Sequence, residues 1–144
     1  MNDPQALREA RALTVRQPWA ALIAAGLKQV ENRSWALPRG FAGPLLIHAG
    51  TKDDREGWAV PGVREALRDR PVIYGALVAV VGRVTSHPCA SCCAERGGEP
   101  GASHWELEDL RALPEAITAT GRLSLWRPEP GAVAAALAAP HSGG

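Results

Sequence analysis

The stretches Arg16-Gln17-Pro18-Trp19-Ala20 and, six residues further on, Gly26-Leu27-Lys28-Gln29-Val30-Glu31-Asn32-Arg33 decide how this chain begins to fold. Pro18 suits the first position of a helix, where a missing N–H costs nothing, and Gly26 suits the residue after its end. The apolar run before Arg16 and the alternation after Gly26 each predict a strand. A strand, a short helix and a strand are therefore expected, with basic side chains at both corners.

The rest of the chain continues to alternate between strands and helices. Apolar or alternating runs predict strands at 12–15, 29–35, 43–49, 72–84, 105–110, 116–120 and 123–126. Helices are expected at 4–10, 18–25, 54–58 after an N-capping Asp53, 63–68 and 130–138. This order predicts an α+β fold, a strongly bent mixed sheet or small β-barrel with flanking helices.

Length and composition indicate one domain. The 144 residues, 46% hydrophobic and 22% charged with a formal charge of +1, can bury a core without disulfides or metal. We expect a polar lead-in at 1–11, one domain at 12–138 with an irregular insertion at 86–103, and a disordered tail at 139–144. No secretory signal or membrane-length apolar run is evident, and the cysteines form no disulfide framework, so a cytoplasmic protein is expected.

Charge is unevenly spread along the chain. Residues 11–52 contain six basic side chains and one acid, Glu31, whereas residues 73–144 contain five arginines and seven acids. This segregation predicts one face that attracts anions, unless folding disperses the charges.

Ten residues are candidates for a nucleic-acid site. The cations expected to contact phosphates are Arg16, Lys28, Arg39 and Lys52. The side chains expected to hydrogen-bond a base edge are Gln17, Glu31, Arg33 and His48, and those expected to stack on a base are Trp19 and Trp105. Five of the ten have a structural alternative: an ion pair for Glu31 and Arg33, a satisfied core position for His48, and packing for the two tryptophans.

The cysteine cluster is a weak metal signal. Cys89 and Cys92 form one C-x-x-C pair, and His104 lies downstream, but the adjacent Cys93 and the lack of a second pair fit zinc poorly. We expect unligated thiols, no metal and no cofactor. The absence of a Walker loop, G-x-G-x-x-G, H-E-x-x-H and a nucleophile elbow excludes the common NTPase, dehydrogenase, metalloprotease and serine hydrolase classes.

These motifs resemble the ASCH domain (activating signal cointegrator homology), a branch of the PUA-like superfamily. Besides 16–20 and 26–35, the matching stretches are 43–50, 74–81, 104–109, 112–115 and 121–128, which together span most of 12–128. The resemblance implies a small, bent PUA-like β-barrel with flanking helices. It also implies a cleft suited to RNA or modified nucleobases, in which the basic residues lie together.

The leading hypothesis is therefore a module that binds RNA, single-stranded DNA or a modified nucleoside, not an enzyme and not a membrane protein. One alternative is an enzyme in the same cleft using Lys28, Glu31 and His48, either a ribonuclease or an amidohydrolase. Lys28 matches the catalytic lysine of a branch that hydrolyses N4-acetylcytidine, but Glu31 stands where that branch has its threonine nucleophile and cannot make the same alkoxide attack. The other alternative is a protein-interaction module using the cysteine-rich insertion.

Overall fold

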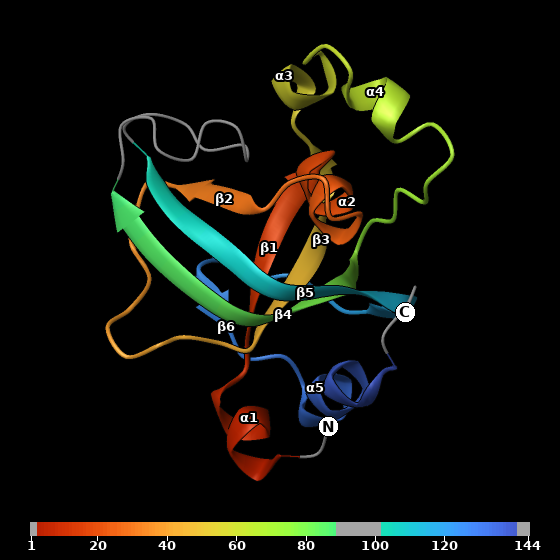
Figure 1. Cartoon of the computed structure of the whole chain (residues 1–144). Helices are drawn as coiled ribbons and strands as arrows, with labels where there is room; N and C mark the ends of the chain where they lie inside the picture. The colour runs from red at the N-terminus through yellow and green to blue at the C-terminus, as the bar shows by residue number, and fades with distance from the viewer. Residues whose placement is uncertain (1–2, 89–101, 141–144) are drawn as a thin grey trace.

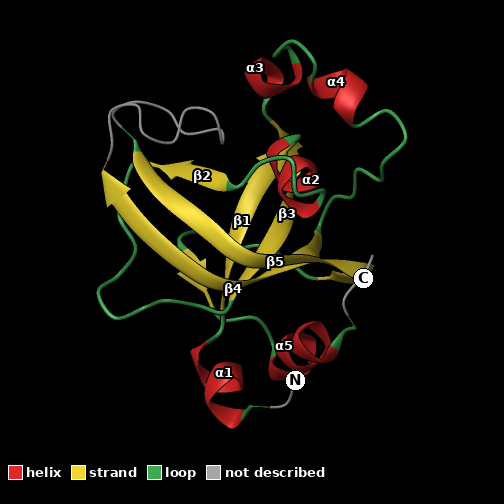
Figure 2. Ribbon diagram, in the orientation of Figure 1, coloured by secondary structure: helices red, strands yellow, loops and turns green. Residues whose placement is uncertain are grey.

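A computed structural model describes residues 3–88 and 102–140 of the chain (Figure 1). The elements are α1 (Pro4–Glu9), β1 (Arg11–Gln17), α2 (Trp19–Ala24), β2 (Val30–Arg33), β3 (Leu45–Asp53), α3 (Arg55–Trp58), α4 (Val63–Ala66), β4 (Ala76–Pro88), β5 (Ser103–Thr118), β6 (Leu125–Trp126) and α5 (Pro130–Ala138). The helices are short and lie around a curved sheet (Figure 2). No helix in these two ranges is long and apolar enough to cross a membrane.

The six strands form one mixed sheet in the order β2-β5-β4-β3-β1-β6. Strands β1 and β3 are parallel, and α2 and β2 supply the long connection that a parallel pair requires. The other neighbouring pairs are antiparallel. The long strands β4 and β5 curve across β1 and β3 (Figure 1). The predicted α+β class and bent mixed sheet are therefore confirmed.

The predicted closure into a barrel is not confirmed, because no backbone ladder joins edge strands β2 and β6 in the described part of the chain. The short strand β2 instead contacts β1 through the side chain of Arg33. Arg33 Nη2 donates a hydrogen bond to the Thr14 carbonyl oxygen at 2.9 Å. The seam between β2 and β1 is thus bridged by a guanidinium rather than by strand pairing, and it borders the cavity described below.

Both faces of the central strand β3 are covered. Along β3, Leu45 and Ile47 face a core shared with α2, whereas Leu46 faces a second core closed by Val133 and Leu137 of α5. This alternation follows from the two-residue period of a strand. Helix α1 packs against the second core, and a third cluster joins α2 to α4.

Two strands expected at 105–110 and 116–120 are one strand, β5. Leu110 pairs with Val81, and Ile117 pairs with Leu77. Between these pairs the register shifts at Leu77/Ala79 of β4, because β5 has extra residues around Pro114 that bulge out of the ladder. Of the insertion expected at 86–103, residues 86–88 and 103 are paired strand residues, and 89–101 lie outside the described ranges. The C-terminal helix has the predicted bounds, and the end of the expected tail, 141–144, is also outside them.

Candidate functional site

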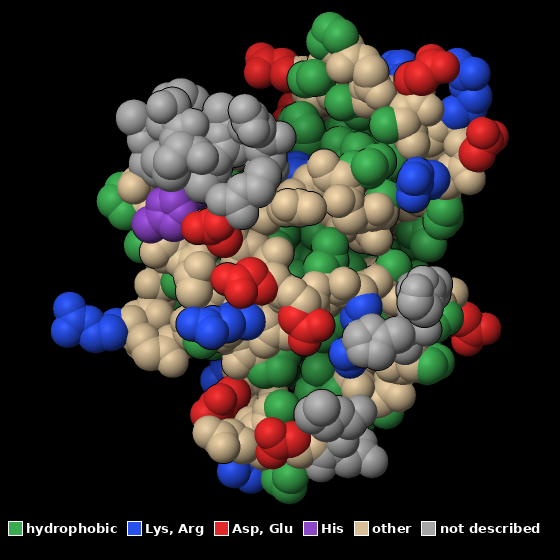
Figure 3. Space-filling view, viewed as in Figure 1, with side chains coloured by type: hydrophobic (Ala, Val, Ile, Leu, Met, Phe, Trp, Pro, Cys, Tyr) green, Lys and Arg blue, Asp and Glu red, His purple; other side chains and the backbone are tan. Residues whose placement is uncertain are grey.

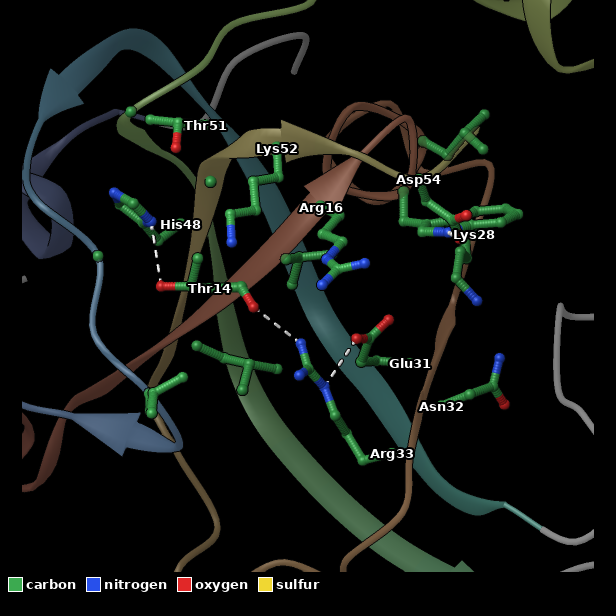
Figure 4. A pocket seen from close by; sticks show the side chains of 18 of the residues that line it. Thr14, Arg16, Lys28, Glu31, Asn32, Arg33, His48, Thr51, Lys52 and Asp54 are labelled. Carbon is green, nitrogen blue, oxygen red and sulfur yellow. Dashed lines mark hydrogen bonds and ion pairs between the residues drawn. The ribbon is translucent and has the colours of Figure 1, made fainter. Parts of the chain in front are cut away.

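A cavity of about 1430 Å³ lies at the seam between β1 and β2 (Figure 4). Its walls come from β1, α2 and the turn after it, β2, the second half of β3, the α3–α4 connection and the segment 118–124 that links β5 to β6. Sites for single small molecules usually measure about 300–1,000 Å³. This cavity is large enough for a ligand bigger than one nucleoside.

Three exposed cations from three separate elements line the cavity: Arg16 of β1, Lys52 of β3 and Arg122 of the 118–124 segment. Within 3–88 and 102–140, none of the three forms an ion pair. The two lining acids are engaged by other groups: Glu31 by Arg33, and Asp54 by the indole of Trp19. Arg16 also interacts electrostatically with Asp54 and helps to lower the pKa of that carboxyl. Arg16, Lys52 and Arg122, hereafter the cation set, present positive charge to a ligand.

Counting all lining residues, the cavity has five cations, with Lys28 and Arg33 added to the cation set, against two acids. On the face formed by β4 and β5, by contrast, acidic and basic side chains are interspersed (Figure 3). Four of the six basic side chains of residues 11–52 thus lie at the cavity, and Arg122 joins them from the C-terminal part of the chain.

Glu31, Arg33 and Lys28 form a charged group on the β2 side. Glu31 Oε2 lies 2.9 Å from Arg33 Nε, as expected for residues two apart on one strand face. Lys28 Nζ donates to the Val30 carbonyl oxygen at 2.6 Å and lies 5.4 Å from the Trp19 ring centre, within cation–π range. Burial raises the pKa of Glu31 above its ordinary value of 4.5, although the positive charges of Arg33 and Lys28 oppose this.

The raised pKa of Glu31 predicts a pH effect on stability. The folded state holds this proton more tightly than the unfolded state, so Glu31 contributes less to the free energy of unfolding as pH rises from 4.5 through the raised folded pKa. In Glu31→Gln this contribution is absent, and stability is expected to fall less over that range. Urea unfolding of both proteins between about pH 4 and 8 measures the difference. Glu65→Gln, on an exposed ion pair, is the control, and superimposable profiles for wild type and Glu31→Gln would contradict the assignment.

His48 anchors the 118–124 segment to the floor of the cavity. Its Nε2 lies 2.6 Å from the Ala119 carbonyl oxygen, and its Nδ1 lies 3.2 Å from Thr14 Oγ1, which accepts a hydrogen bond from Trp126 Nε1. Because a carbonyl only accepts, the neutral ring carries its proton on Nε2, and Nδ1 accepts from Thr14. Both ring nitrogens thus contact protein atoms, which favours the structural alternative for this histidine.

Gly121 lets the segment lie this close. A Cβ at that position would be 2.7 Å from Thr14 Oγ1 and 2.8 Å from His48 Cε1, nearer than side chains allow. Because residue 121 has no side chain, the segment can lie against His48. Arg122, the next residue, therefore lines the cavity.

Seven of the ten predicted binding residues line the cavity: Arg16, Trp19, Lys28, Glu31, Arg33, His48 and Lys52. Three do not. Arg39 lies in an exposed turn away from it, and Gln17 is buried, with its side chain bonded to the Ile73 carbonyl oxygen and the Ala21 N–H. Trp105 is 0% exposed and has no ring face open to a base.

Trp19 lies at the edge of the cavity with its indole fixed in place. Its Nε1 donates to Asp54 Oδ2 at 2.8 Å, and this bond lowers the pKa of that carboxyl. The ring also packs on Gly57, where a Cβ would lie 2.7 Å from it. Trp19 therefore braces α2 against α3 as well as lining the cavity.

Several lining residues were not among the sequence candidates: Thr14, Asn32, Asp54, Arg122 and Leu123. Arg122 follows a glycine in a short polar stretch, and no pattern in the sequence brings that stretch beside β1.

The metal hypothesis rested on Cys89, Cys92 and His104. The two cysteines lie outside the described residues, and His104 is buried on β5 with its ring centre 5.8 Å from that of His87. In the part of the chain that is described, no three metal-ligating side chains cluster.

The chain matches a known protein family. The model of a family described as the ASCH domain matches residues 13–115, which include most of β1, all of β2 to β4 and most of β5. No curated protein matches the chain. The matched range holds every wall of the cavity except the 118–124 segment.

Proposed function

Because the chain belongs to the ASCH domain family, we propose that it is a binding module for RNA or single-stranded DNA, including strands with modified nucleosides, and that the ligand enters the cavity at the β1–β2 seam. The observation that carries the proposal is the cation set. Three cations from separate elements, none of them in an ion pair among the described residues, converge on one cavity in which Glu31 is paired with Arg33 and Asp54 is the other acid. Such a surface attracts a phosphate backbone.

The two sides of the cavity suit the two parts of a nucleotide. The cation set offers charge to phosphates, which fixes position without reading sequence. On the β2 side, the Lys28 ammonium and the Glu31 carboxyl are buried and supply a donor and an acceptor. Base edges carry donors and acceptors in fixed order, so this side is suited to a base edge.

The test is binding of a fluorescent ten-nucleotide single-stranded RNA at several salt concentrations. Three phosphate contacts predict a slope of log K against log salt of about −2, and Arg122→Ala is expected to reduce its magnitude by about 0.7. Arg39→Ala, an exposed arginine outside the cavity, is the matched control and is expected to leave the slope unchanged. No binding to any nucleic acid, or binding insensitive to salt, would contradict the proposal.

A second candidate function, hydrolysis, is favoured by Lys28 and Glu31. Both are buried at the cavity wall, and the raised pKa of Glu31 is in the direction that general acid–base catalysis near neutral pH requires. Incubation with N4-acetylcytidine and with end-labelled RNA tests it. Turnover that is lost in Lys28→Ala would favour the enzyme over the binding module, and absence of turnover would favour the binding module.

A further inference from the structure

Exposed hydrophobic side chains from three segments of the chain line the cavity. The described residues include four exposed large hydrophobic side chains, and three of them line it: Leu27 (52% exposed), Val60 (44%) and Leu123 (92%). They come from the turn after α2, the α3–α4 connection and the β5–β6 segment. A single exposed hydrophobic side chain is ordinary on a protein surface, but three such side chains lining one cavity indicate a binding surface. We call these three residues the apolar rim.

The apolar rim and the cation set share the same cavity, and Leu123 follows Arg122 directly in the chain. The matching ligand therefore has negative charge along one side and apolar faces along another. Unpaired nucleotides have this chemistry, because each carries a phosphate and a base whose flat face avoids water. A duplex hides those faces in its stack, so it offers phosphates and groove edges but no apolar base face.

The number of cations in the cation set indicates how many nucleotides the ligand has. The cation set provides one cation for each of about three phosphates, and the cavity exceeds the usual size of a small-molecule site. Building on the proposed nucleic-acid binding, we propose that the cavity takes about three consecutive unpaired nucleotides rather than a free nucleoside. The phosphates contact the cation set, and base faces lie against the apolar rim.

Ligand length is tested by competition. Uridine mono-, di-, tri- and pentanucleotides compete with the labelled ten-nucleotide RNA, and at 0.1 M salt affinity is expected to rise about fivefold with each added phosphate contact. The rise should end at about three nucleotides. If uridine monophosphate competes as well as the trinucleotide, the length inference is wrong while binding stands; if the labelled RNA does not bind, the proposed function itself fails.

The apolar rim is tested by Leu27→Ser and Leu123→Ser. Each is expected to weaken trinucleotide binding about fivefold, as loss of a small apolar contact predicts, with the salt slope unchanged. Tyr74→Ser is the matched control, because Tyr74 is the fourth exposed hydrophobic residue and lies outside the cavity lining. Unchanged affinity in both rim variants, or equal affinity for a duplex of the same sequence, would overturn the proposal. Stronger competition by an acidic, leucine-containing peptide than by the trinucleotide would assign the rim to a protein partner instead.

Discussion

Trp105→Ala is expected to destabilise the protein by about 3–5 kcal/mol, a large part of the stability of a domain this size. The side chain is fully buried, its ring meets Trp35 edge-on with centres 4.8 Å apart, and its Nε1 donates to the Trp35 carbonyl oxygen. Trp105 also pairs with Glu31 across β5 and β2. Truncation leaves a cavity beneath the strand that carries the Glu31–Arg33 ion pair. Urea unfolding measures the loss.

Two variants keep this prediction testable if Trp105→Ala does not fold. Trp105→Phe retains a ring and is expected to lose only part of the stability. Trp58→Ala removes a half-buried tryptophan and should cost less than Trp105→Ala. A Trp105→Ala protein within about 1 kcal/mol of wild type that binds RNA poorly would instead support a stacking role for this residue.

Removing the whole cation set is expected to have the largest effect on binding. In Arg16→Ala/Lys52→Ala/Arg122→Ala, the loss of three phosphate contacts, each contributing about 0.7 decades at 0.1 M salt, predicts about 100-fold weaker binding of single-stranded RNA. The salt slope should approach zero. The fold should be retained, because all three side chains are exposed and none forms an ion pair among the described residues.

The control for this triple variant is Arg39→Ala/Arg70→Ala/Arg83→Ala. It changes the net charge by the same amount at exposed positions outside the cavity lining. Fluorescence anisotropy with the same RNA compares the two proteins, and thermal unfolding checks that both are folded. Equal losses of affinity would show that net charge alone governs binding and that the cavity has no special role.

The candidate site was partly visible in the sequence because local patterns orient side chains. The two-residue period of a strand placed Glu31 and Arg33 on one face, and they form an ion pair. The same kind of reasoning failed for Gln17 and Trp105. Polarity and aromaticity made both plausible ligand contacts, but neighbouring elements bury them, and burial depends on what packs against a strand.

By itself, the sequence determined the element types, the bounds of α5, the placement of α2 between Pro18 and Gly26, and the basic character of the first third of the chain. These features depend on residues close together in the chain, through backbone preferences and side-chain periodicity. Only the tertiary structure decided that no ladder joins the edge strands β2 and β6 in the described residues and that Arg122 joins Arg16 and Lys52 at the cavity. Strand order and the docking of the 118–124 segment on His48 depend on contacts between residues far apart in sequence, which no local pattern specifies.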